Sequence, residues 1–314
     1  MLRRSFLIAA ALAVASAPVV HAADFVNIVT GGTSGVYYPL GVAVSKVIAQ
    51  YVPGARPSVQ ATKASVENLN LLEEGKAEVA FTLGDSLAFA WKGNAEAGFK
   101  HPLEKLRTIG AIYPNYIQVV ATRDSGIKTL ADLKGKRLSV GAPASGTELN
   151  ARAILAAAGL SYKDLSKVEY LPFGESVDLM KNRQLDATLQ SAGLGVASIR
   201  DLASSVPITV VAIPAAVVKK AGAPYVAAEI PAGTYTGQDA AVETATVPNY
   251  LVTRAGLSDD EVYAITKAIY DHLDQLVAAH SAAKGIHLDA AAKNLPVPLH
   301  PGAARYFKEK GVLK

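Results

Sequence analysis

The sequence contains no cysteine, so it can form neither a disulfide nor the acylated cysteine of a bacterial lipoprotein. The excess of one charge sign over the other is also small. The 31 lysines and arginines barely exceed the 27 acidic residues, and the formal net charge is only +4. So small an excess argues against nucleic acid as a partner.

Catalytic motifs are missing as well. The chain has no Gly-x-Ser-x-Gly elbow and no His-Glu-x-x-His pair, and its six histidines do not cluster with acids at metal-ligand spacing. We therefore expect no enzyme activity, no metal and no cofactor. Asp85, which follows an apolar strand, is the one candidate general base; it could equally cap the next helix or receive a ligand's ammonium group.

The first 22 residues have the pattern of a secretory signal. Arg3 and Arg4 precede the apolar stretch Phe6 to Val14, and small residues end at Ala22. We expect cleavage after Ala22 or Ala23, because the apolar stretch is too short to span a bilayer as an uncleaved anchor. Loss of Arg3 and Arg4 would leave 29 basic against 27 acidic residues, or +2. No later apolar run is long enough to cross a membrane, so the mature protein is predicted to be periplasmic.

The best-defined motif after the signal runs from Phe25 to Tyr51. A β-branched strand, Phe25 to Thr30, is followed by a loop with glycines at 31, 32 and 35, and then by a helix with an apolar face. Glycines permit positive φ and bring backbone N–H groups close to a ligand. Such a loop at a helix N-terminus is an anion site, because unpaired N–H groups and the helix dipole point the same way.

This loop fits neither familiar nucleotide motif. It lacks the lysine of a Walker loop, and its glycines do not follow Gly-x-Gly-x-x-Gly. The sequence thus indicates an anion loop without a nucleotide, with an ordinary strand-to-helix turn as the alternative.

Two further strands, 56–61 and 78–82, also end in polar loops. With the first loop, these loops fall at 30–37, 62–65 and 84–86. The alternation of short strands and helices predicts an α/β fold with mainly parallel strands. Because open α/β sheets bind ligands at the carboxyl edge of their strands, we expect the three loops to meet there.

The middle of the chain repeats this logic. A strand at 137–140 leads into Gly141 to Glu148 and a helix, so Ser145 and Thr147 offer hydroxyls at a second helix N-terminus. A later strand, 185–189, ends in the turn Gln190 to Gly193. Two such edges facing each other would enclose a small polar anion.

Two similar long strands bracket this middle segment. Residues 109–122 contain Pro114-Asn115-Tyr116, and 242–253 contain Pro248-Asn249-Tyr250 in the corresponding place. They would suit a two-strand hinge between lobes, although chance similarity of a tripeptide is the open alternative. We accordingly predict lobe I from 23–122 plus 246–314 and lobe II from 123–245. A single long helix is expected from Ser258 to about Ala283.

Four segments together resemble the TAXI family of TRAP transporter solute receptors. They are TGGTSGVYYPLG from Thr30, SVENL from Ser65, GAPASGTE from Gly141 and VPNYLVT from Val247. The resemblance implies a type II periplasmic binding protein fold whose two lobes close on an amino acid or organic acid, such as glutamate or a dicarboxylate, for delivery to an ion-gradient-driven TRAP-type permease. The chain departs from the family at Lys63-Ala64 and Leu83-Gly84, both at the expected pocket. Lys63 could pair with a second carboxylate or lie exposed.

The sequence thus predicts a monomeric binding protein for a small carboxylate. The predicted ligand-binding residues are Gly32, Thr33, Ser34, Gly35, Val36, Tyr37, Lys63, Ser65, Asp85, Ser145, Gly146, Thr147, Gln190, Ser191, Ala192 and Gly193. An exported enzyme using Asp85 as a base and a sensory binding module are the alternatives.

Overall fold

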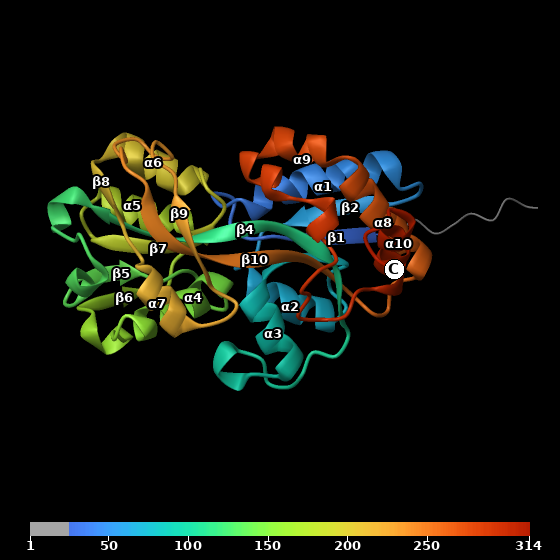
Figure 1. Cartoon of the computed structure of the whole chain (residues 1–314), viewed down its shortest axis with the longest axis horizontal. Coiled ribbons are helices and arrows are strands. Elements are labelled where there is room, and N and C mark those ends of the chain that lie inside the picture. Colours follow the sequence, from blue (N-terminus) through green and yellow to red (C-terminus); the bar gives the residue numbers. More distant parts are fainter. Residues whose placement is uncertain (1–24) are drawn as a thin grey trace, which may run out of the picture.

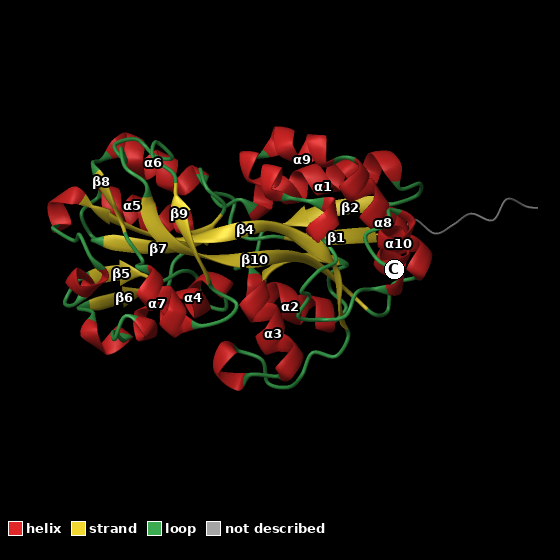
Figure 2. Cartoon of the chain, viewed as in Figure 1, coloured by secondary structure: helices red, strands yellow, loops and turns green. Residues whose placement is uncertain are grey.

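The computed structural model describes residues 25–314, so the predicted signal peptide lies outside the described residues. One ten-stranded sheet runs through the molecule in the order β2-β1-β3-β10-β4-β7-β5-β6, with β8 paired to β4 and β9 to β10. Helices cover both faces of this sheet in each of two lobes, and β4 and β10 cross between the lobes (Figures 1 and 2). The predicted two-lobed, doubly wound α/β fold is confirmed.

The first lobe is built on three parallel strands joined by helices. These elements are β1 (Phe25–Val29), α1 (Tyr37–Tyr51), β2 (Arg56–Gln60), α2 (Ser65–Glu73), β3 (Val79–Leu83) and α3 (Gly84–Lys92). Figure 1 shows α1 on one face of the sheet and α2 and α3 on the other. As predicted, α1 buries the spaced apolar residues Leu40, Val44, Val47 and Ile48. This amphipathic pattern anchors the helix on the strands.

The second lobe repeats the same strand order, with its first strand central. Its elements are β5 (Arg137–Ser139), α4 (Gly146–Ala157), β6 (Lys167–Glu169), α5 (Phe173–Lys181), β7 (Ala187–Ala192), α6 (Ala197–Ser205), β8 (Ile208–Val211), α7 (Ala215–Ala221) and β9 (Val226–Ile230). β5 pairs in parallel with both β6 and β7. Residues 190–192, predicted as a turn, are the last part of strand β7.

The crossover strands β4 (Leu106–Thr122) and β10 (Val242–Arg254) are antiparallel neighbours. Pro114 lies opposite Pro248, and the register shifts immediately after this pair. Proline donates no backbone N–H, so the ladder is interrupted there, and the Asn249 side chain donates instead to the Tyr113 carbonyl at 2.9 Å. Near these residues the pairing of β4 changes: residues 106–116 pair with β10, and residues 116–121 pair with β7 of the second lobe. The lobe boundaries after residues 122 and 245 stay a proposal.

The predicted long C-terminal helix is wrong. It is divided into α8 (Asp259–Asp271) and α9 (Leu273–Ala279), because His272 has the non-helical φ of −129°. His272 stacks on Tyr51 of α1 with ring centroids 3.5 Å apart. Ser258 caps α8 as expected, since its side chain accepts from the Glu261 N–H. Both helices pack on α1 of the first lobe.

The remaining helices are short. They are α10 (Pro301–Glu309) and the 3-10 turns Ala95–Ala97, Arg123–Ser125, Leu130–Leu133, Tyr162–Asp164, Ser281–Gly285 and Leu288–Ala290. Among residues 25–314, none of the helices combines the length and apolar character that crossing a bilayer requires.

Candidate functional site

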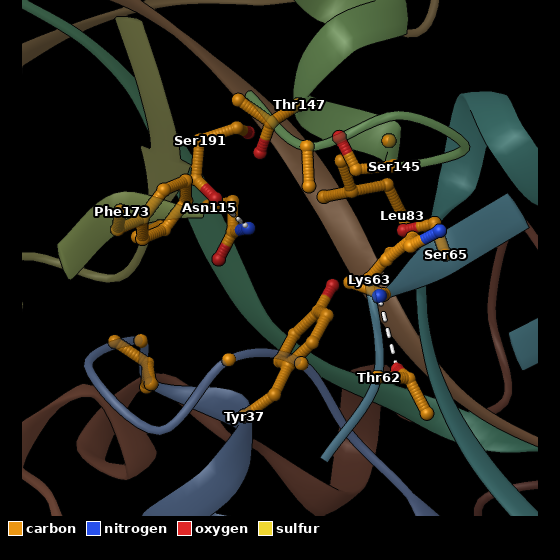
Figure 3. A pocket seen from close by; sticks show the side chains of 18 of the residues that line it. Tyr37, Thr62, Lys63, Ser65, Leu83, Asn115, Ser145, Thr147, Phe173 and Ser191 are labelled. Carbon is orange, nitrogen blue, oxygen red and sulfur yellow. Dashed lines mark hydrogen bonds between the residues drawn. The ribbon is translucent and has the colours of Figure 1, made fainter. Parts of the chain in front are cut away.

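A cavity of about 110 Å³ lies between the two lobes. Figure 3 shows Tyr37 entering it from the first lobe, opposite Thr147 and Ser191 of the second. Its lining residues are Gly31, Gly32, Gly35, Val36, Tyr37, Thr62, Lys63, Ala64, Ser65, Leu83, Tyr113, Asn115, Ala142, Ser145, Gly146, Thr147, Pro172, Phe173, Ser191 and Ala192. The strands of both lobes therefore deliver their carboxyl ends to one place, as open α/β sheets do.

Five helices direct their N-termini at this cavity. The capping residues of α1 to α5 all belong to its lining: Val36, Ala64, Leu83, Ser145 and Pro172. The first N–H groups of a helix have no intrahelical partner, and the dipole places partial positive charge there. The electrostatic field in the cavity consequently favours an anion.

The N-terminus of α1 is the least compensated of the five. Val36 makes no side-chain capping bond, and no acidic residue lies in the first turn. The glycines at 31, 32 and 35 were expected to allow positive φ, but none has it. Two of them are closely packed instead: a Cβ at Gly35 would lie 3.3 Å from the Gly32 carbonyl oxygen, and one at Gly31 would lie 3.3 Å from Ala64 Cβ, whereas Gly32 has open space around it.

The α4 terminus uses its hydroxyls in two ways. Ser145 caps the helix by accepting a 3.2 Å bond from the Glu148 N–H. Thr147 is the second residue of the helix and turns its hydroxyl toward the cavity in Figure 3. Ser145 thus stabilises the helix, whereas Thr147 is available to a ligand.

Ala64 stands at the α2 terminus with φ 72° and ψ −161°. This region is almost restricted to glycine, and a side chain there costs on the order of 1–3 kcal/mol. Its neighbour Ser65 is fully buried and accepts from the Leu83 N–H at 3.1 Å. The strained residue therefore lies in the cavity wall, at the position where the sequence departs from its resemblance.

A hydrogen-bond network joins the cavity to both crossover strands. The Tyr37 hydroxyl donates to Asn249 Oδ1 at 2.5 Å, and Asn249 Nδ2 donates to Asn115 Oδ1 at 2.7 Å. Asn115 Nδ2 donates in turn to the Ser191 carbonyl at 3.0 Å. The two asparagines of the repeated tripeptides thus link α1 of one lobe to β7 of the other.

Two buried hydroxyls of the lining, those of Tyr113 and Ser191, have no hydrogen-bond partner. Burial also raises the pKa of Tyr113 well above its usual value, so its hydroxyl stays protonated. Buried polar groups are nearly always paired in native proteins. A ligand that reaches these two hydroxyls would supply the hydrogen-bond partners that they lack.

Most of the predicted site residues line this cavity. The predicted residues in the lining are Gly32, Gly35, Val36, Tyr37, Lys63, Ser65, Ser145, Gly146, Thr147, Ser191 and Ala192. Outside it lie Thr33, Ser34, Asp85, Gln190 and Gly193. Gln190 is buried within β7 and accepts from the Ser198 hydroxyl at 2.6 Å, whereas Ser191 and Ala192 at the end of this strand reach the lining.

Asp85 instead joins the lobes behind the cavity. Its Oδ2 accepts from Asn150 Nδ2 at 2.5 Å and from the Tyr225 hydroxyl at 2.8 Å, while Oδ1 accepts from the Ser86 N–H at 2.7 Å. Asp85 is only 2% exposed, and this burial raises its pKa. A carboxyl held in this way does not face a substrate in the cavity. We call Asp85, Asn150 and Tyr225 the Asp85 contact.

Sequence reasoning missed several lining residues, chiefly the aromatic rings of Tyr113 and Phe173. Phe173 is the first residue of α5, which follows strand β6. The other cavity loops were predicted because polar residues lie between a strand and a helix, and the segment before Phe173 has no such polar motif. Asn115 was noticed only as part of the hinge repeat. Lys63, by contrast, was predicted and lies in the lining, with an exposed side chain.

No group of three or more metal-ligating side chains occurs in residues 25–314. The profile of the NMT1-like family matches residues 28–311. The chain belongs to the NMT1-like family. A match that covers almost all described residues places both lobes in it.

Solved structures resemble this NMT1-like protein at low sequence identity. One described as a periplasmic transporter has a TM-score of 0.57 at 12% identity, covering 92% of this chain and 93% of that chain. A Listeria monocytogenes protein described as an L-cystine ABC transporter has 0.52 at 14%, covering 85% and 98%. A Xanthomonas citri protein bound to ATP has 0.51 at 12%, covering 92% and 97%. At these identities the likeness establishes the fold alone.

Proposed function

We propose that this protein is an exported, non-enzymatic receptor that closes its two lobes on a small organic anion, a carboxylate, and presents it to a membrane permease. The observation that supports this most directly is the convergence of five helix N-termini on an interlobe cavity. Oriented N–H groups bind a carboxylate without the ordering cost of a long side chain.

An enzyme is the weaker candidate. The lining contains no histidine, aspartate or glutamate, so no carboxylate or imidazole base faces the cavity. Asp85, the candidate base, holds Asn150 and Tyr225 instead. A ligand incubated with the protein should be recovered chemically unchanged, and formation of a product would overturn the receptor proposal.

The permease class is proposed from the sequence motifs, which resemble TRAP receptors. The Listeria structure is described as an ABC transporter, so the fold is compatible with ATP-driven partners too. Uptake of the bound carboxylate by cells tests this choice. A TRAP-type partner predicts that collapsing the ion gradient stops uptake at constant ATP, whereas continued uptake would favour an ABC-type partner.

The binding site is tested by comparing Thr147→Val with Lys63→Ala. Valine keeps the shape of threonine but leaves a bound carboxylate oxygen without its hydroxyl partner, at a cost of roughly 1.5–3 kcal/mol or about 10- to 150-fold in affinity. Lys63 is exposed, so we expect its loss to matter less. Calorimetry on both folded variants measures this. Parent-like binding by Thr147→Val together with no binding by Lys63→Ala would mean that a side-chain cation holds the ligand.

A further inference from the structure

The cavity is electrostatically unfavourable for a cation. Five helix N-termini carry partial positive charge toward it, and its lining contributes no carboxylate side chain. A buried ammonium group is costly unless an anion pairs with it. The ammonium group of an amino acid would therefore enter the cavity without the partner that it needs.

Three of the four carboxylates in the first turns of these helices are engaged by protein donors, and the fourth, Glu175 of α5, is exposed to solvent and lies outside the cavity lining. Glu67 accepts from the Lys63 N–H at 2.6 Å, and Glu148 forms a bidentate ion pair with Arg152. Asp85 accepts from the donors of Asn150 and Tyr225. Turning Asp85 toward a ligand would leave those two donors buried and unpaired, which costs more than the original bonds contribute.

The rest of the lining fits a compact apolar body with an oxygen substituent. The rings of Tyr37, Tyr113 and Phe173 border the cavity, and the hydroxyls of Tyr113 and Ser191 lack partners. A hydroxyl can donate to a keto or hydroxyl oxygen. It can also accept from an ammonium group, but it supplies no negative charge to offset that group's desolvation.

We propose that the cavity selects 2-oxo and 2-hydroxy carboxylates with a compact apolar or aromatic body and discriminates against the matching amino acids. This inference rests on the proposed receptor function. It narrows the organic anion to one whose substituent beside the carboxylate is an oxygen rather than an ammonium group. Lys63 is the one cationic side chain among the described residues that line the cavity, and it is exposed, so it can pair with a second carboxylate of the ligand.

Matched ligand sets test the selection on the purified mature protein. Phenyllactate, phenylpyruvate, phenylpropionate and phenylalanine form one set, and 2-hydroxyglutarate, 2-oxoglutarate, glutarate and glutamate form a second. Thermal shift and calorimetry should show at least one oxygen-substituted acid binding ten or more times tighter than its amino acid. An amino acid that binds as tightly as its oxygen-substituted partner would overturn the inference and leave the receptor function standing. If no carboxylate binds, the receptor proposal is wrong, and this inference, which rests on it, is wrong as well.

A substitution in the wall sharpens the test. Ser191→Asp places a carboxylate in the lining, with Ser191→Asn as the matched neutral control. We expect the aspartate variant to shift preference toward the amino acid by about tenfold relative to the asparagine variant, with folding of both checked by circular dichroism. Equal preference in the two variants would show that the missing carboxylate does not set the selection.

Discussion

The two lobes meet in two different ways. In the cavity, the hydroxyls of Tyr113 and Ser191 lie buried without partners. In the Asp85 contact, both oxygens of one carboxyl are satisfied by donors from its own helix and from the opposite lobe. Because unpaired buried polar groups are costly, the cavity is the part of the interface that a ligand completes. The Asp85 carboxyl needs no ligand to be fully paired, although the neighbouring Asn150 Oδ1 is buried without a partner among residues 25–314.

The largest effect is expected from preventing the lobes from meeting at the cavity. A Cβ at Gly146 of the second lobe would lie 2.6 Å from Leu83 Cδ1 and 2.9 Å from Ser65 Cβ of the first. Gly146→Ala should overpack the closed form by about 1–3 kcal/mol and reduce affinity about 5- to 150-fold.

Gly174→Ala is the matched control for this change. It also faces the first lobe from the start of a helix, but its nearest atom, Ser34 Oγ, lies at 3.4 Å. Calorimetry should find the control close to the parent, and small-angle scattering should show that Gly146→Ala alone fails to compact with ligand. Equal binding by both variants would mean that the lobes need not close at this point.

Weakening the Asp85 contact should change the rate of ligand release more than the rate of capture. Tyr225→Phe removes one interlobe hydrogen bond, worth about 1 kcal/mol, so release should accelerate roughly fivefold. Tyr250→Phe is the control, because the Tyr250 hydroxyl donates to Asn294 within the first lobe. Stopped-flow measurements with a bound carboxylate compare them. Unchanged release from Tyr225→Phe would show that this contact does not hold the closed form.

Relieving strain in the cavity wall should stabilise the protein modestly. Ala64→Gly allows the positive φ of 72° without a side chain, and we expect a gain of about 1 kcal/mol in the free energy of unfolding. Ala144, with φ 58°, offers a second such site outside the cavity lining. Denaturant unfolding without ligand measures both, and a loss of stability in Ala64→Gly would contradict the assignment of strain.

The smallest effect concerns pH. Burial raises the pKa of Asp85 above its value in the unfolded chain, so the Asp85 carboxyl binds a proton more tightly in the folded state. Its contribution to stability is present below the ordinary aspartate pKa of about 4 and is lost as pH rises through the raised value. Asp85→Asn removes the titrating carboxyl and with it this pH-dependent loss of stability. The free energy of unfolding of the parent should therefore fall relative to that of the variant as pH rises. A difference that stays constant from pH 4 upward would argue against a buried, proton-binding Asp85.

The sequence alone determined the fold and much of the cavity, because those depend on local patterns. Loop glycines, the hydroxyls at Ser145 and Thr147 and the alternation of strands and helices each act within a few residues. The repeated tripeptides also pointed to the crossover strands, whose asparagines proved to hydrogen-bond to each other.

Only the tertiary structure decided which polar residues reach the cavity. Asp85 and Thr147 both follow strands at helix starts, yet one bonds to the opposite lobe and the other lines the cavity. Phe173 and Tyr113 complete the wall without any local polar motif. Whether a buried group is free or paired depends on donors far away in the chain, such as Tyr225 for Asp85. Local sequence patterns carry no information about those partners, so folding of both lobes is what fixes them.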